Sequence, residues 1–262
     1  MQTRRASTIA RDRHTKPATK KAGPIADPPL YDVFLAGELV DLVVPNERAI
    51  HTDGWYAWLN DQVLTRNMEQ GMYPKSAELQ TAYLAELRGS QSRLALMIKP
   101  KAQDAVVGIC SFSKISQATR QADFAMVVAR RAASFKSSFF GMEAKCLMTE
   151  HAFETLGIER INSYQSTALK DWQRWQILFG YKMEGIMRKA FRKGYKTYDL
   201  MVSGCLLEDY LELKALHGGR LWPGQERIMG LIRDLPKTSL EEKLQKALGS
   251  TIEQHYAKLR LA

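Results

Sequence analysis

The stretch that most constrains the fold is residues 121–158, where an apolar run leads through a short basic segment directly into an amphipathic helix. The run QADFAMVVAR has the composition of a strand, and GMEAKCLMTEHAFETLGI carries apolar residues at helical spacing. The first turn of a helix presents backbone N–H groups without internal acceptors and the positive end of the helix dipole. Such a junction binds anions, so we expect the diphosphate of a cofactor to lie here.

Charge is distributed unevenly along the chain of 262 residues, which carries a formal net charge of +10. Residues 1–30 hold seven Lys or Arg and two Asp, so they carry half of the chain's net positive charge, and they contain few apolar residues. Such a segment cannot bury enough surface to order itself, so we predict a disordered basic tail over residues 1–30. A main domain over residues 31–210 and a helical extension over residues 211–262 follow. An organelle transit peptide is the alternative interpretation of the tail.

Cysteine usage and hydropathy indicate the compartment. The three cysteines lie in apolar segments without CxxC spacing or a nearby His, which indicates neither a disulfide framework nor a metal site: Cys110, Cys146 and Cys205. No apolar run approaches the roughly 20 residues of a membrane-spanning helix. We therefore expect a cytoplasmic protein without a membrane partner, in which only the basic tail could contact nucleic acid.

Hydrophobic periodicity predicts the order β-α-α-β-β-β-α-β-α-β-β. The strands are expected at 38–45, 93–98, 105–112, 121–130, 160–165, 181–192 and 196–204, with a hairpin turn at Lys193-Gly194. The helices are expected at 51–68, 76–88, about 140–156 and 169–179, and a further amphipathic helix at 239–262. This last helix packs either on the domain itself or on a second copy in a homodimer.

Four local patterns carry a resemblance to a known family. Trp55–Val63 (WYAWLNDQV) resembles a W-x-x-W-x-N-D-x-x-V pattern, and Ala122–Phe124 (ADF) lies where relatives often have Ala-Glu-Ile. Phe140–Ile161 is similar to a cofactor helix opened by G-x-E-A, and Phe179–Tyr210 is similar to a G-F-x-x-E-G ending with its hairpin. Together, residues 38–210 resemble the GCN5-related N-acetyltransferase (GNAT) superfamily. The first pattern resembles the branch of ribosomal-protein N-terminal and nucleotide-sugar amine acetyltransferases.

The resemblance implies an α/β (α+β) fold with a mixed, mostly antiparallel sheet of about seven strands, flanked by about four helices. It implies transfer of an acetyl group from acetyl-CoA to a primary amine. The backbone of Met126, Val127 and Val128 is expected to pair with the pantetheine arm and to supply the oxyanion donor. The Q/R-x-x-G-x-G/A diphosphate loop corresponds to Lys136, Ser137, Ser138, Phe139, Phe140 and Gly141, with Phe139 in place of the middle glycine.

The resemblance also indicates catalytic residues, with one departure. Asp123 matches an acidic position that often orients water or the amine. In many relatives a tyrosine protonates the departing thiolate, but Gln176 stands at that position here. Tyr164 is the nearest tyrosine and is the candidate substitute. Two tryptophans at i and i+3, Trp172 and Trp175, form either an aromatic wall beside the cofactor or part of the core.

Three functions remain open from the sequence. The first is N-acetylation of a small amine, with a nucleotide-linked amino sugar as the leading candidate because of the Trp-rich pattern. The second is acetylation of proteins or peptides, for which the basic tail and the charged hairpin could recruit an acidic partner. The third is a CoA-binding module with weak or no catalysis, in which the fold persists without the usual tyrosine and glycine.

Overall fold

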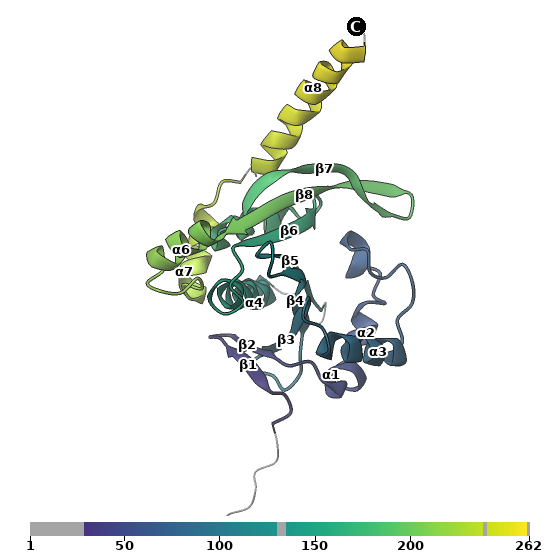
Figure 1. The fold of residues 1–262 in the computed structure, drawn as a ribbon, viewed down its shortest axis with the longest axis vertical. Helices are drawn as coiled ribbons and strands as arrows, with labels where there is room; N and C mark the ends of the chain where they lie inside the picture. The colour runs from purple at the N-terminus through teal and green to yellow at the C-terminus, as the bar shows by residue number, and fades with distance from the viewer. Residues whose placement is uncertain (1–28, 130–134, 238–239, 261–262) are drawn as a thin grey trace, which may run out of the picture.

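The computed structural model describes residues 29–129, 135–237 and 240–260, and most of the predicted basic tail lies outside this part of the chain. One mixed sheet of eight strands, in the order β1-β2-β3-β4-β5-β6-β8-β7, forms the centre of the molecule (Figure 1). The strands are β1 Val33–Ala36, β2 Val40–Val43, β3 Leu94–Pro100, β4 Gly108–Ser116, β5 Gln121–Val128, β6 Arg160–Ser166, β7 Lys182–Lys193 and β8 Lys196–Leu206. All neighbours pair antiparallel except β5 and β6, which are parallel.

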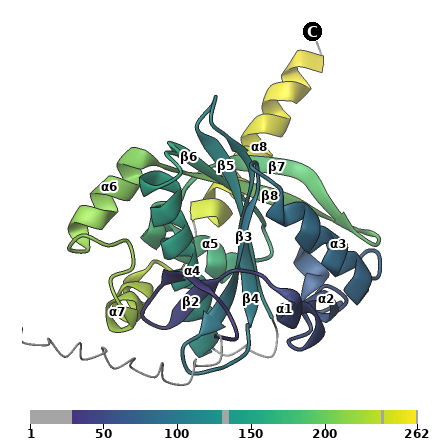
Figure 2. The same cartoon turned by 60° about the horizontal axis from the view of Figure 1, so that its bottom comes forward.

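Helices cover both faces of the sheet (Figure 2). On one face lie α4 Phe135–Glu154, α5 Lys170–Trp175 with the 3₁₀ turn η3 Gln176–Phe179, α6 Leu207–Leu216 and α7 Gln225–Asp234. On the other lie α1 Glu47–His51, α2 Trp55–Trp58, the 3₁₀ turn η1 Thr65–Asn67 and α3 Ala77–Arg88. Alternate strand residues therefore enter two separate cores: Phe124 packs toward α4, whereas Met97 packs toward α1–α3.

The predicted fold class is confirmed, with two differences in its elements. A short strand, β1, precedes the first predicted one. The single helix predicted over residues 51–68 is wrong, because the chain forms α1, α2 and η1 there instead. Gly54 adopts a left-handed conformation with φ of 74°, which breaks the helix between α1 and α2, and Asn46 caps α1 by accepting from the N–H of Ala49.

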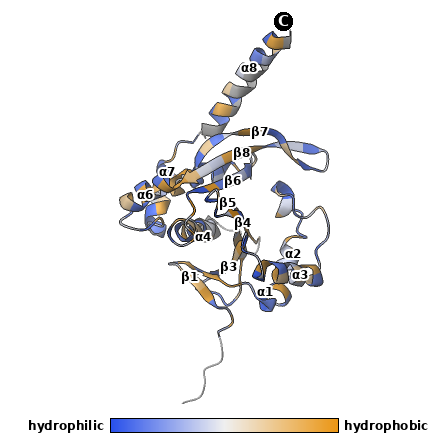
Figure 3. Ribbon diagram, viewed as in Figure 1, coloured by the Kyte–Doolittle hydropathy of each residue, from blue (hydrophilic) through white to orange (hydrophobic). Residues whose placement is uncertain are grey.

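The segment after β8 packs against the outer side of α4. The ring of Tyr210 in α6 stacks on Phe153 with centroids 5.0 Å apart, and the indole N–H of Trp222 donates to Glu38 at 2.8 Å. The predicted C-terminal helix is present as α8 Leu240–Arg260, which extends away from the rest of the molecule and carries both hydrophilic and hydrophobic residues (Figure 3). No described helix has the length and apolar character to cross a membrane.

Candidate active site

The parallel strands β5 and β6 pair over only part of their length. Their register runs from Gln121 opposite Arg160 to Phe124 opposite Ser163, and no further pairs follow. Beyond this point β5 pairs only with β4, up to Val128 opposite Gly108, while β6 pairs only with β8. Residues 125–128 therefore have a strand edge without a partner on the β6 side within the described residues. An unpaired edge inside a sheet can hydrogen-bond to an extended ligand.

The helix that follows β5 begins earlier than predicted. It starts at Phe135 rather than near Phe140, so the six predicted diphosphate-binding residues lie in its first two turns and do not form a loop. Within α4, the N–H groups of residues 135–137 have no acceptor four residues earlier on the helix. The side chains of Lys136 and Ser137 lie outside the described part of the structure. The side chain of Phe139 is buried in the core, which explains why the family's glycine can be absent there.

Gly141 sets the distance between α4 and β5. A Cβ atom at this position would lie 3.0 Å from Cε of Met126 and 3.4 Å from Cγ2 of Val128. These two β5 residues belong to the segment with the unpaired edge. The glycine therefore permits close helix–strand packing beside that segment, and its structural role is independent of any phosphate contact.

Glu143, the acid of the G-x-E-A pattern, anchors α4 to the sheet edge. Its buried carboxylate accepts the backbone N–H groups of Glu38, Leu39 and Val40, the last two at 2.8 and 3.0 Å. Gly37 completes the contact, since a Cβ there would lie 2.5 Å from Oε1 of Glu143. The turn between β1 and β2 is thus fixed by a side chain from the helix that follows β5.

The two predicted catalytic residues lie on the face of the sheet opposite α4. Asp123 accepts from the amide of Asn162 at 3.0 Å and pairs with the ammonium of Lys114 at 2.8 Å. Tyr164 follows two residues after Asn162 on β6 and therefore shares its face. The structure thus brings Asp123 and Tyr164 to one face of adjacent strands, but no direct contact between them is present.

Two further charges continue this polar row across the sheet. Arg160 donates to Asn162 at 2.7 Å and forms a bidentate pair with Glu184 of β7. The row therefore runs from β4 to β7 with alternating signs. Neither Asp123 nor Glu184 is left as an uncompensated negative charge.

Gln176, which replaces the family's tyrosine, is part of a buried amide network. Its Oε1 accepts from the side-chain amide of Gln165 at 2.7 Å and from the hydroxyl of Ser203 at 3.3 Å. These bonds hold η3 against β6 and β8. The side chain carries no titrating proton, so this position cannot act as a general acid.

Lys145 lies one helical turn after Gly141 and is completely buried. Its Nζ atom is 3.4 Å from the ring centroid of Tyr181, 5.1 Å from Phe124 and 5.7 Å from Trp172, and it has no hydrogen-bond partner. Burial lowers the pKa of Lys145 to about 7, and only the thiols of Cys205 and Cys146 oppose this shift. Three rings from different elements thus enclose an amine without an anionic partner.

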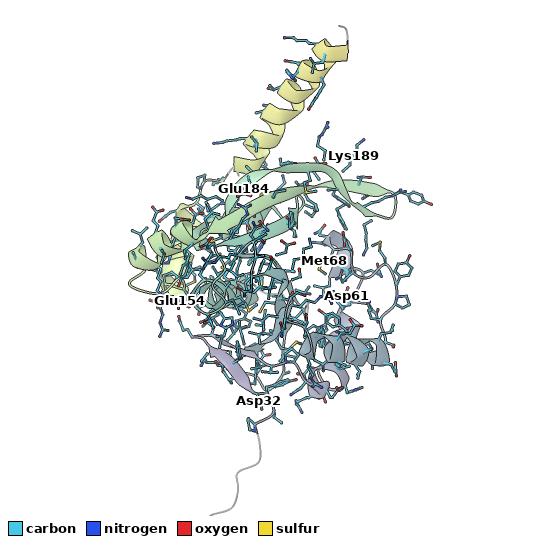
Figure 4. The ribbon with its side chains drawn as sticks, viewed as in Figure 1. Asp32, Asp61, Met68, Glu154, Glu184 and Lys189 are labelled. Carbon is cyan, nitrogen blue, oxygen red and sulfur yellow. The ribbon has the colours of Figure 1, made fainter. Side chains whose placement is uncertain are left out.

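The Asn-Asp pair of the W-x-x-W-x-N-D pattern closes a loop over residues 60–75. Asn60 exchanges two hydrogen bonds with the backbone of Lys75, both 2.7 Å, and Asp61 accepts the N–H groups of Val63 and Leu64. Lys193 from the tip of the β7–β8 hairpin donates to the carbonyls of Met68 and Gln70 at 3.3 and 2.5 Å. Figure 4 labels Asp61 and Met68 in this loop. The loop and the hairpin are therefore joined on the side of the sheet that carries Asp123.

Sequence reasoning missed Lys145 and the anchoring role of Glu143. One signal for Lys145 was present: a lysine four residues after Gly141, on the helix face that the glycine places against β5. No local signal indicated the backbone partners of Glu143. Trp172 and Trp175 both pack against the main core, and Trp172 also contributes a ring around Lys145.

Solved structures of similar fold are acetyltransferases. A GCN5-related N-acetyltransferase from Brucella melitensis superposes with a TM-score of 0.59 at 20% identity, covering 77% of this chain and 94% of that one. Spermidine N-acetyltransferase from Vibrio cholerae, in complex with CoA and spermine, superposes with a TM-score of 0.59 at 13% identity, covering 66% of this chain and 98% of that one. The Microcin C7 self immunity acetyltransferase MccE, in complex with acetyl-CoA and AMP, superposes with a TM-score of 0.55 at 16% identity, covering 65% of this chain and 94% of that one. No curated protein sequence matches significantly.

A family model supplies the sequence-level evidence. Residues 42–168 match the model described as Acetyltransferase (GNAT) domain, a segment that runs from within β2 past the end of β6 and includes the whole of α4. The match confirms the predicted class of acetyl-CoA-dependent N-acetyltransferases, whereas the predicted branch within it stays a prediction. Residues 42–168 thus match a GNAT acetyltransferase domain, and the parted strands and the helix that follows them lie within this segment.

Proposed function

We propose that this protein transfers an acetyl group from acetyl-CoA to the primary amine of a small molecule. The observation that carries the proposal is the parting of β5 and β6 beyond the Phe124–Ser163 pair, beside the start of α4. The unpaired edge of residues 126–128 would hold the pantetheine arm, and the N–H groups of residues 135–137 would bind the diphosphate. The residues present therefore fit the co-substrate without the family's usual glycine.

The chain's own groups would position the reaction. Backbone N–H groups of residues 126–128 would stabilise the negative charge that develops on the thioester oxygen. Asp123, held in place by Lys114 and Asn162, would orient the acceptor amine or a water that takes its proton. Tyr164 lies on the same face and is the predicted proton donor on that side of the sheet.

The charge row on this face favours a particular class of acceptor. The spermidine N-acetyltransferase that shares the fold was solved with spermine, a polycation, which requires free carboxylates. In this chain Asp123 and Glu184 are both already paired with cations. MccE was solved with a nucleotide, AMP. These observations support a nucleotide-linked amino sugar over a polyamine as the acceptor.

Two measurements test the proposal in sequence. Isothermal calorimetry with acetyl-CoA comes first, and absence of binding at high micromolar concentration rejects the function. A panel of nucleotide-linked amino sugars, spermidine and short peptides, read by free-thiol release, then identifies the acceptor. Turnover confined to peptides would indicate a protein acetyltransferase, and binding without any turnover would indicate a CoA-binding module.

A substitution tests the role of Asp123 directly. Asp123→Asn should lower kcat by about 10²-fold or more while the affinity for acetyl-CoA stays unchanged. Glu159→Gln is the matched control, because Glu159 is an exposed acid paired with Arg120 at the start of β6. Equal activity of the two variants would exclude Asp123 from the reaction.

A further inference from the structure

We propose that Lys145 is the cation that receives the coenzyme A sulfur as a thiolate and returns a proton to it. The inference rests on the proposed function and assigns the proton donor that the family's tyrosine position cannot supply.

The amine of Lys145 is completely buried and has no hydrogen-bond partner. An ammonium removed from water is unfavourable unless an anion or hydrogen-bond acceptors replace the lost hydration. Nζ of Lys145 has no acceptor, and its polar neighbours are the thiols of Cys205 and Cys146. Rings of Phe124, Trp172 and Tyr181 compensate only in part. The site is thus complementary to a negative charge that is absent from the described residues.

The position of Lys145 links this charge to the parted strands. Phe124, which contacts Nζ, is the last β5 residue paired with β6. Gly141, one turn earlier on α4, lies against Met126 and Val128, whose strand edge is unpaired. The helix face from Gly141 to Lys145 therefore follows the line along which the thioester arm would lie. Because Lys145 is completely buried, the sulfur would approach it from between the strands and not from solvent.

The proton transfer is balanced as follows. When the acceptor nitrogen has bonded to the acetyl carbon, the carbon–sulfur bond breaks and its electron pair stays on sulfur. The ammonium of Lys145 then donates a proton to that sulfur, which leaves a neutral amine and a free thiol. The proton released by the acceptor nitrogen passes to solvent, and Lys145 regains a proton from water that enters between the parted strands once coenzyme A has left.

Other titratable groups around Lys145 are poorer proton donors near neutral pH. Burial raises the pKa of Tyr181 well above its usual range, and its hydroxyl is hydrogen-bonded to Thr149. Burial also raises the pKa of Cys146, and that of Cys205 to about 12. Of these groups, Lys145 has the lowest pKa, so it gives up its proton most readily near neutral pH.

The test compares ligands that differ only at sulfur. Coenzyme A, desulfo-coenzyme A and acetyl-CoA are titrated into the full chain by calorimetry near neutral pH. The wild type should bind coenzyme A about tenfold or more tightly than desulfo-coenzyme A. Lys145→Met should abolish this preference and leave acetyl-CoA affinity within about threefold.

Controls separate this proposal from a merely structural lysine. Lys145→Gln is a second neutral variant, and Lys196→Met, at an exposed position in the hairpin, should behave as the wild type. A preference for coenzyme A that persists in both neutral variants overturns the proposal while the acetyltransferase function stands. Failure of the wild type to bind acetyl-CoA overturns both.

Discussion

Replacing Glu143 by alanine should destabilise the fold more than any single exposed charge would. The carboxylate is buried and accepts three backbone N–H groups from residues 38–40. A hydrogen bond to a charged group contributes about 1.5 kcal/mol or more, and donors left without an acceptor add a desolvation penalty. Three such bonds, with some donors regaining water in the vacated space, predict a loss of about 3–5 kcal/mol.

The matched control for Glu143→Ala lies two turns further along α4. Glu150 accepts a single backbone N–H, from Leu221 at 2.6 Å, so Glu150→Ala should cost only about 1–2 kcal/mol. Urea unfolding followed by circular dichroism gives both values, and hydrogen exchange at residues 38–40 reports the freed amides. If the two variants lose the same stability, or if exchange at residues 38–40 is unchanged, the anchoring role of Glu143 is refuted.

Three further predictions concern the helix and the hairpin. At pH 7, Lys145→Met should raise the free energy of unfolding by about 3 kcal/mol. Burial lowers the pKa of Lys145 from 10.5 to about 7, which costs the folded wild type about 5 kcal/mol, and attraction to the three rings offsets about 2 kcal/mol of that cost. The unfolded chain binds this proton more tightly, so the stability of the wild type relative to the variant should rise between pH 7 and 10.5. A stability difference from urea unfolding that stays constant over this pH range would contradict the prediction. Gly141→Val should push α4 away from Met126, because the added side chain has no room beside β5. The free energy of unfolding should fall by about 2 kcal/mol, which lowers the Tm in thermal melts, and acetyl-CoA binding should weaken. An unchanged Tm would argue against close packing. Lys193→Ala should accelerate hydrogen exchange in residues 60–75, whereas Lys196→Ala, its cross-strand partner, should not.

Local patterns in the chain predicted most of the architecture. The order of strands and helices from 93 to 206 follows from periodicities of two and 3.6 residues, which depend only on nearby residues. The helix predicted at 76–88 is likewise present as α3, which follows Ser76, whose side chain accepts from the N–H of Leu79. The single helix predicted over 51–68 failed because Gly54 separates α1 from α2, although Trp55 and Trp58 keep helical spacing within α2. Periodicity therefore identifies which face is apolar more reliably than it identifies where a helix begins.

The candidate site was predicted only in part, because its chemistry depends on contacts between distant residues. Asp123 and the strand end at Met126–Val128 could be named from the resemblance, and they lie where β5 leaves β6. The helical start at Phe135 and the burial of Phe139 could not be read from the same pattern. A glycine motif specifies a loop in relatives, but a phenylalanine in its place can be accommodated by packing that the motif does not encode.

The amino-acid order alone specifies an alternating α/β chain with an anion-binding helix start after its fourth predicted strand, because those features arise from neighbours a few residues apart. Tertiary structure decides that Glu143 binds amides more than 100 residues away and that Lys145 loses water among three rings. It also decides where β5 and β6 part. Pairing register and burial are properties of the assembled sheet, and no local spacing contains them.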